Sequence, residues 1–272
     1  MQNPVVPTSL PAAAVLSEGE GPAVVLLHAF PLDRGMWAAQ VAALSGRYHV
    51  HAVDTFGFGG CELPTGGWGV ESMADALAGW LVAQRIPTPV AVCGLSMGGY
   101  VALAFARRHA NHLRALVLAD TRAEPDSPEA RAARDIAIVA VQAHGSSAQV
   151  EAMLPKVLGP TTHAERPGVV SDFRRTGLAQ DKVAVAAGLV ALRDRPDARP
   201  GLAAIDAPTL VVVGAEDSLT PPSAAEALAA GIRGARLVVL PKAGHLSNLE
   251  TPDAFNAAVL DFLDGLEPTS GR

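Results

Sequence analysis

Short apolar runs alternate along the chain with longer segments in which apolar residues recur at helical spacing. Four of the six runs are apolar at nearly every position, which is typical of strands covered by helices on both faces. The runs span residues 22–28, 48–54, 89–94, 113–120, 208–214 and 235–241. Helices are expected near residues 35–44, 70–84, 97–109, 222–231 and 252–265. This order predicts an α/β fold with a doubly wound, mostly parallel sheet of about eight strands.

The interval 121–197 interrupts this alternation. It contains no strand-like run and shows helical patterns instead, with Ser127 before a proline as a helix start. We expect a helical cap here, inserted into an α/β core made of residues 1–120 and 198–272. The interval has 10 basic and 10 acidic residues, and Phe173 is its only aromatic residue. A pocket beneath such a cap is expected to be aliphatic and close to neutral.

Composition limits the classes of function. Of the 272 residues, 49% are hydrophobic and 18% are charged, which supports a substantial core. The net charge of −6 argues against binding to nucleic acid, which requires concentrated basic residues. No run reaches the roughly 18 apolar residues of a membrane span, and the first residues lack the basic start of a secretory signal. We expect a cytoplasmic protein without a membrane or nucleic-acid partner, and its oligomeric state stays open.

The segment Gly-Leu-Ser96-Met-Gly-Gly, residues 94–99, carries the strongest chemical signal. It follows an apolar strand and begins a helix. A strand that turns sharply into a helix exposes the residue at the corner, and flanking glycines avoid a clash of Cβ atoms in so tight a turn. Ser96 is therefore the predicted nucleophile, beside a helix start that favours developing negative charge.

A serine hydroxyl needs a base, and the base needs a carboxylate that orients it. His245 follows the last predicted strand, and Asp217 follows the strand before it. The chain order Ser, Asp, His is the one expected of this architecture. Asp217 has rivals in the adjacent Glu216 and in Asp120, which ends the strand after the nucleophile helix. Asp54 is expected to organise a loop.

Backbone N–H groups are expected to bind the oxyanion of the transition state, because they are fixed before the charge develops. The predicted donors are the N–H of Met97, directly after the nucleophile, and that of Phe30, in the loop after the first strand run. His28 is expected to be a structural residue of that loop. The predicted substrate-binding residues are aliphatic: Ile136, Ile138, Met153, Leu154 and Leu192.

The chain resembles the α/β-hydrolase superfamily over nearly its full length. The resemblance rests on the elbow at 94–99, His-Ala-Phe-Pro at 28–31, Gly-Ala-Glu-Asp at 214–217 and Ala-Gly-His at 243–245. Within the superfamily, residues 118–135 resemble capped esterases close to the 3-oxoadipate enol-lactonase group. Relatives that open epoxides or remove halides attack with an aspartate, where this chain has Ser96.

These observations predict a serine hydrolase that cleaves small to medium, mainly aliphatic carboxylic esters through an acyl-enzyme. One alternative is lactone or enol-lactone hydrolysis, with Arg122, Arg131 or Arg134 binding a substrate carboxylate. Others are cofactor-free perhydrolysis or haloperoxidation, and a non-catalytic ligand receptor. No cofactor is expected, because the chain has no strand-linked dinucleotide or phosphate-binding loop. No metal is expected either, since His49 and His51 lack a third ligand nearby.

Overall fold

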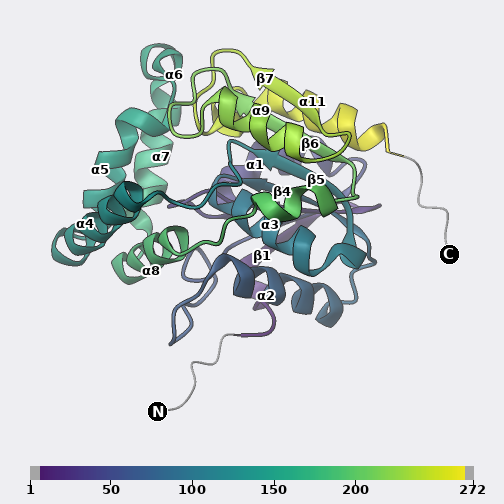
Figure 1. Cartoon of the computed structure of the whole chain (residues 1–272), viewed down its shortest axis with the longest axis horizontal. Helices are drawn as coiled ribbons and strands as arrows, with labels where there is room; N and C mark the ends of the chain where they lie inside the picture. The colour runs from purple at the N-terminus through teal and green to yellow at the C-terminus, as the bar shows by residue number, and fades with distance from the viewer. Residues whose placement is uncertain (1–6, 267–272) are drawn as a thin grey trace.

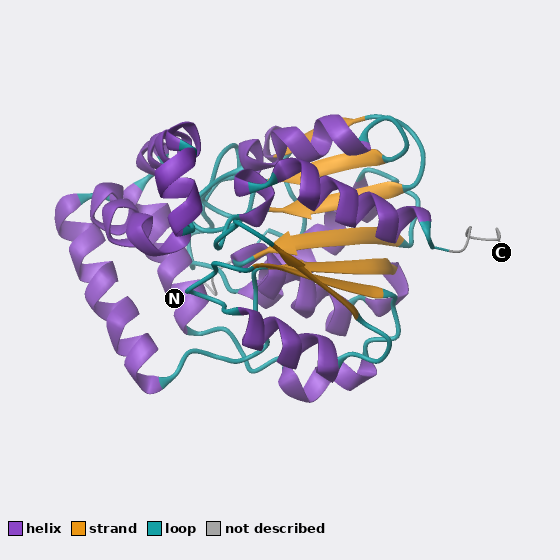
Figure 2. Ribbon diagram, turned by 90° about the horizontal axis from the view of Figure 1, so that it is seen from above, coloured by secondary structure: helices purple, strands orange, loops and turns teal. Residues whose placement is uncertain are grey.

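The computed structural model describes residues 7–266 and consists of a twisted sheet with helices on both faces (Figures 1 and 2). The strands are β1 (Val15–Glu18), β2 (Ala23–Leu27), β3 (His49–Val53), β4 (Val90–Leu95), β5 (Leu113–Ala119), β6 (Thr209–Gly214) and β7 (Arg236–Leu240). Their order across the sheet is β1-β3-β2-β4-β5-β6-β7. All neighbours are parallel except β1, which pairs antiparallel with β3. The six predicted strands are confirmed as β2 to β7.

The sheet formed by residues 7–266 has seven strands, not the expected eight. The sequence pattern also missed β1, because this edge strand is mostly exposed and therefore is not an apolar run. The residues before β1 form a 3₁₀ turn, Ala12–Ala14, after Pro11. This turn ends the pairing with β3, so the described residues before it add no further strand.

Two groups of helices cover the sheet. α1 (Ala38–Leu44) and α11 (Pro252–Asp264) pack on one face, and α2 (Val70–Ala83), α3 (Met97–Arg108) and α9 (Pro222–Gly231) pack on the other. Successive residues of a strand point to opposite faces, so β2 contributes to both hydrophobic clusters. The remaining helical turns outside the insertion are 3₁₀ turns at Arg34–Trp37, Ala110–His112 and Arg199–Ala204, and α10 (Ser247–Glu250).

The interval between β5 and β6 contains helices throughout. They are α4 (Pro128–His144), α5 (Ser146–Val157), α6 (Pro160–Glu165), α7 (Pro167–Ala179) and α8 (Lys182–Arg193). Ser127 caps α4 as predicted, since its hydroxyl accepts a hydrogen bond from the N–H of Ala130 at 3.2 Å. These helices gather beside one end of the sheet (Figures 1 and 2). We call α4 to α8 the inserted helices.

The sheet topology determines where a site can form. β2 lies between β3 and β4, so the chain reverses its direction of travel across the sheet at this strand. In open α/β sheets, ligands bind outside the carboxyl ends of the strands next to such a reversal. The loop after β2 and the turn after β4 therefore lie at the expected place. Within residues 7–266, no helix is both long and apolar enough to cross a membrane.

Candidate active site

Ser96 occupies a sharp turn between β4 and α3. Its φ of 54° lies in the left-handed region, which a non-glycine residue rarely adopts. The two glycines that flank it within two positions are required by close contacts. A Cβ on Gly94 would lie 2.2 Å from the carbonyl oxygen of Gly98, and a Cβ on Gly98 would lie 2.1 Å from that of Leu27. The strained turn holds Ser96 above the carboxyl end of the sheet, as the sequence motif indicated.

Ser96, His245 and Asp217 form a continuous hydrogen-bonded chain. The Oγ atom of Ser96 lies 2.8 Å from Nε2 of His245, and Nδ1 of His245 lies 2.8 Å from Oδ2 of Asp217. An ionised carboxylate only accepts hydrogen bonds, so Nδ1 carries the proton and Nε2 is free to accept from the serine. This is the tautomer that a base acting on Ser96 requires.

A network of donors fixes the carboxylate of Asp217. The N–H groups of Leu219 and Thr220 donate to Oδ1 at 2.8 and 2.9 Å, and the Thr220 hydroxyl donates to Oδ2 at 2.6 Å. The same hydroxyl lies 3.1 Å from Nδ1 of His245. Sequence reasoning missed Thr220, although an aspartate followed closely by threonine before a helix is a recognisable turn signal.

The surroundings of the pair favour its charged form. Burial by itself would raise the pKa of Asp217, but the His245 charge and hydrogen bonds from His245 and Thr220 hold it below the usual range. Burial would likewise lower the pKa of His245, but the charge of Asp217 and the hydrogen bond to it raise the pKa above the ordinary value. Asp217 therefore stabilises the imidazolium that forms when His245 takes a proton.

The rival carboxylates make other contacts. Glu216 accepts hydrogen bonds from the N–H of Thr161 at 2.9 Å and from its hydroxyl. Asp120 accepts from the N–H of Gly214 at 2.9 Å and from the hydroxyl of Ser247 at 2.5 Å. Burial, reinforced by the nearby charge of Asp217, raises the pKa of Asp120 to about 8. Asp217 is the carboxylate that hydrogen-bonds to His245.

Asp120 connects the segments that carry the base and the acid. It is fully buried at the end of β5, with φ at 45°, and it contacts both the end of β6 and the chain just after His245.

Gly244, the residue before His245, lies so close to a neighbouring segment of backbone that a side chain would not fit there. A Cβ there would lie 2.3 Å from the backbone nitrogen of Gly159, so the inserted helices pass directly over the histidine loop.

The two predicted oxyanion donors lie at the same edge of the sheet. Phe30 follows β2, and Met97 is the first residue of α3 after the neighbouring β4. Among residues 7–266, neither N–H donates to a protein acceptor. The first N–H groups of a helix have no partner within it, which leaves the Met97 N–H available to a substrate oxygen.

A cavity of about 290 Å³ opens beside Ser96 and His245. Of the predicted aliphatic lining residues, Met153 and Leu192 lie on its wall. The other three predicted residues are not on this wall. Ile136 is 72% exposed on the outer side of α4, Ile138 packs against the hydrophobic core, and Leu154 is buried in the second core cluster. Whether these side chains face the cavity depends on the rotation of α4 and α5 about their helix axes. Packing decides that rotation.

The cavity wall is more basic than the balanced charge of the interval 121–197 indicated. Arg122, Arg134 and Lys156 all line it. Arg134 is paired with Asp126, but within the described residues neither Arg122 nor Lys156 has a carboxylate partner. Arg122 donates to the carbonyl oxygen of Leu219, and its Nε is buried without an acceptor. Acidic residues elsewhere in the interval 121–197 balance its total charge, so the sequence count does not show this local excess.

The polar residues of the early loops have the structural contacts that we expected. Nδ1 of His28 donates to the carbonyl of Ala29 at 2.9 Å, and Nε2 accepts from the N–H of Thr55 at 2.9 Å. Asp54 organises its loop by accepting from the N–H groups of Arg34 and Gly60, both at 2.7 Å. Residues of the cavity wall that the sequence did not single out are Tyr100, Gln149, Ala152, Lys156, Leu219 and Thr220.

Comparison with known proteins agrees with this geometry. Residues 22–252 match the family described as alpha/beta hydrolase fold. A pimeloyl-[acyl-carrier protein] methyl ester esterase from Neisseria meningitidis is 34% identical, over 92% of this chain and 79% of that protein.

Two solved structures are also similar over most of their lengths. One is a thermophilic esterase from Thermogutta terrifontis with malate bound, which has a TM-score of 0.92 and 37% identity and covers 98% of this chain and 100% of its own. The other is the enol-lactonase from Burkholderia xenovorans LB400, with a TM-score of 0.85, 35% identity and coverage of 92% and 95%. The chain belongs to the α/β-hydrolase fold family and is a carboxylic ester hydrolase of that family.

Proposed function

We propose that this enzyme cleaves small to medium, mainly aliphatic carboxylic esters through an acyl-enzyme on Ser96. One observation carries the proposal, the unbroken chain from Ser96 Oγ through His245 to Asp217, with both contacts at 2.8 Å. The cavity beside this chain has room for a substrate of moderate size, and Met153 and Leu192 supply aliphatic surface.

The reaction proceeds in two steps. His245 takes the proton of Ser96 as Oγ attacks the ester carbonyl, and the N–H groups of Phe30 and Met97 donate to the oxyanion. The carbon–oxygen bond to the alcohol then breaks, and His245 gives its proton to the leaving alkoxide. A water molecule, deprotonated by His245, attacks the acyl-enzyme and releases the acid. Asp217 stabilises the imidazolium in both steps.

The inserted helices serve as a cap in this proposal. Gln149, Ala152, Met153 and Lys156 reach the cavity from α5, and Leu192 reaches it from α8. These side chains limit the access of water and the size of the substrate. The division into an α/β core, 1–120 and 198–272, and a cap, 121–197, follows from this role.

The test is hydrolysis of p-nitrophenyl esters from acetate to decanoate by the wild type and by Ser96→Ala. We expect the rate to peak at one chain length and to fall by about 10³-fold or more in the variant. A variant that retains the wild-type rate would refute the nucleophile. An inert wild type would refute the ester substrate.

A second candidate function is hydrolysis of an ester or lactone that bears a carboxylate. The observation in its favour is the excess of cations on the cavity wall, above all Arg122, which has no carboxylate partner among residues 7–266. Two of the similar proteins fit this chemistry. One was solved with the dicarboxylate malate bound, and the other is an enol-lactonase.

The two candidates differ in their response to substrate charge. The comparison uses the monomethyl and dimethyl esters of one aliphatic dicarboxylic acid with the wild type, Arg122→Ala and Arg131→Ala. Arg131 is the matched control, because it pairs with Asp194 at 2.8 Å and does not line the cavity. If Arg122 binds the carboxylate, its removal lowers kcat/KM for the monoester by about tenfold or more, since a hydrogen bond to a charged group is lost. Equal losses on both esters would favour the neutral substrate.

A further inference from the structure

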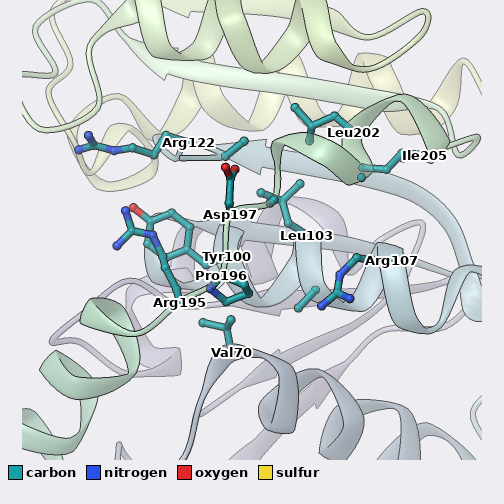
Figure 3. A pocket seen from close by; sticks show the side chains of 14 residues that line it. Val70, Tyr100, Leu103, Arg107, Arg122, Arg195, Pro196, Asp197, Leu202 and Ile205 are labelled. Atoms are coloured by element: carbon teal, nitrogen blue, oxygen red, sulfur yellow. The ribbon is translucent and has the colours of Figure 1, made fainter. Parts of the chain in front are cut away.

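A second cavity lies next to the active-site cavity, between α2, α3 and the segment 195–205. Its inner wall is apolar and includes Val70, Leu103, Leu202 and Ile205, which come from α2, α3, the 3₁₀ turn Arg199–Ala204 and the residue after that turn (Figure 3). Arg107 and Asp197 also line it. Each is paired with a residue outside the cavity, Arg107 with Glu71 and Asp197 with Arg199. Of the other charged residues on the wall, Arg195 pairs with Asp126, and Arg122, which is shared with the active-site cavity, has no carboxylate partner among residues 7–266. The apolar part of the wall suits an aliphatic chain.

Tyr100 separates this cavity from the active site. It lines both cavities, and so does Arg122. Tyr100 lies four residues after the nucleophile, in the first turn of α3, and both residues line the active-site cavity. Figure 3 shows its ring beside Arg195, on the side opposite Leu202 and Ile205.

Arg195 holds the Tyr100 ring in place. The guanidinium carbon lies 4.3 Å from the ring centroid, within cation–π range. Arg195 itself is only 4% exposed. It donates to Asp126 Oδ1 at 2.5 Å and to the carbonyl oxygens of Leu192 and Glu124 at 2.7 and 2.9 Å. The ring therefore lies against a side chain whose position is fixed by its own hydrogen bonds.

The second cavity has little room for a chain while the ring is present. Its free volume is about 30 Å³, against about 290 Å³ for the active-site cavity. Removing the Tyr100 ring would open the wall and add the volume of the ring itself. The two cavities would then form one continuous space.

We infer that Tyr100 is a specificity-determining residue that sets the longest aliphatic chain the active site accepts, by closing it off from the second cavity. This inference rests on the proposed ester hydrolysis. The substrate class concerned is esters whose acyl or alkyl chain runs from the scissile carbonyl toward α3. In the wild type such a chain ends against the ring, and longer chains must leave part of their length in water.

The test measures chain-length profiles in Tyr100→Ala. One series varies the acyl chain of p-nitrophenyl esters, and another varies the alcohol chain of alkyl acetates, so that each part of the substrate is tested separately. In one of these series, the ratio of kcat/KM for a ten-carbon to a four-carbon chain should rise by about tenfold or more, since each methylene buried in an apolar space adds to binding. Tyr100→Leu, which keeps more of the packing, should shift the profile the same way.

Two further variants test whether the missing ring is what changes the chain-length preference. Tyr100→Phe keeps the ring and should keep the wild-type chain-length preference, since the Tyr100 hydroxyl has no hydrogen-bond partner among residues 7–266. Gly201→Leu fills the second cavity from its far wall, and a Cβ there meets only Arg107 Cδ at 3.6 Å. Added to Tyr100→Ala, it should return the preference to shorter chains.

The outcomes separate this inference from the proposed function. If the wild type hydrolyses short esters but Tyr100→Ala and Tyr100→Leu keep its profile in both series, the inference is wrong and the proposed function stands. If Gly201→Leu alone shortens the preference of the wild type, the ring does not close the second cavity, and the inference is also wrong. If the wild type hydrolyses no ester, the proposed function itself fails.

Discussion

The backbone N–H of Gly159, between α5 and α6, donates a hydrogen bond at 2.8 Å to Oε2 of Glu250 in α10. Glu250 is 1% exposed, and its other oxygen accepts from the N–H of Leu246 at 3.0 Å, next to His245. One buried carboxylate thus ties the inserted helices to the loop that carries the base. The position of His245 depends on this contact as well as on the α/β core.

Glu250→Ala should lower the free energy of unfolding by about 3 kcal/mol, because it leaves buried donors without an acceptor. The donors include the Gly159 N–H and the Thr162 hydroxyl, which lies 2.7 Å from Oε2. Urea unfolding measures the effect. Thr162→Val removes one partner and leaves the carboxylate in place, so it should cost distinctly less. Equal losses in the two variants would contradict a central role for Glu250.

Asp217→Asn should reduce kcat by about 10⁴-fold, because an amide in this place favours the wrong tautomer of the histidine. Steady-state rates on a p-nitrophenyl ester measure the loss. The matched control is Glu216→Gln, which changes the adjacent carboxylate that contacts Thr161 and does not face His245. It should stay near the wild-type rate. A larger loss in Glu216→Gln than in Asp217→Asn would reverse the assignment of the acid.

The pH dependence of kcat/KM should report the ionisation of His245. The residue acts as a base only when neutral, and Asp217 raises its pKa above the ordinary 6.5. Activity should therefore fall as the pH drops through a midpoint above that value. The charge of Arg122 lowers the pKa of His245, so Arg122→Ala should move the midpoint to higher pH.

Arg131→Ala is the control for this shift, because Arg131 does not line the cavity. It should leave the midpoint where it is in the wild type. The profile is measured with p-nitrophenyl acetate, a neutral substrate, so that the loss of a carboxylate contact does not affect it. A midpoint that moves to lower pH in Arg122→Ala would mean that this arginine does not act electrostatically on the base.

Asp120→Ala should lower both stability and kcat, because Asp120 connects the end of β6 to the chain after His245. It would leave the Gly214 N–H and the Ser247 groups without their acceptor, and a cost of about 3 kcal/mol or more is expected for buried donors. Thermal unfolding and kcat on one ester measure the two effects. Ser247→Ala removes only one donor and should lose less. An Asp120→Ala enzyme with wild-type kcat would show that this connection does not position the base.

Local patterns predicted the parts of the molecule that depend on near neighbours in the chain. The six parallel strands were visible as apolar runs, and four of these runs are apolar at nearly every position because helices cover both faces of the sheet there. The turn at Ser96 was visible because its close backbone contacts admit only glycine at positions 94 and 98. The exposed edge strand β1 left no such pattern and was missed.

The wall of the cavity could not be predicted in this way. Ile136 is on an apolar stretch of α4 yet faces solvent, and Arg122, in a segment of balanced charge, lies beside His245. The same holds for Tyr100, which only tertiary structure places between two cavities.

The sequence by itself determined the strands, the nucleophile turn and the order of Ser96, Asp217 and His245, because these depend on hydrophobic period and short-range steric contacts. Tertiary structure alone decided the contacts of Asp120, the hydrogen bond from Gly159 to Glu250 and the basic lining of the cavity. The physical reason is that the rotation of each inserted helix and the approach of distant loops are fixed by packing between segments far apart in the chain. That packing leaves no periodic pattern in the residues themselves.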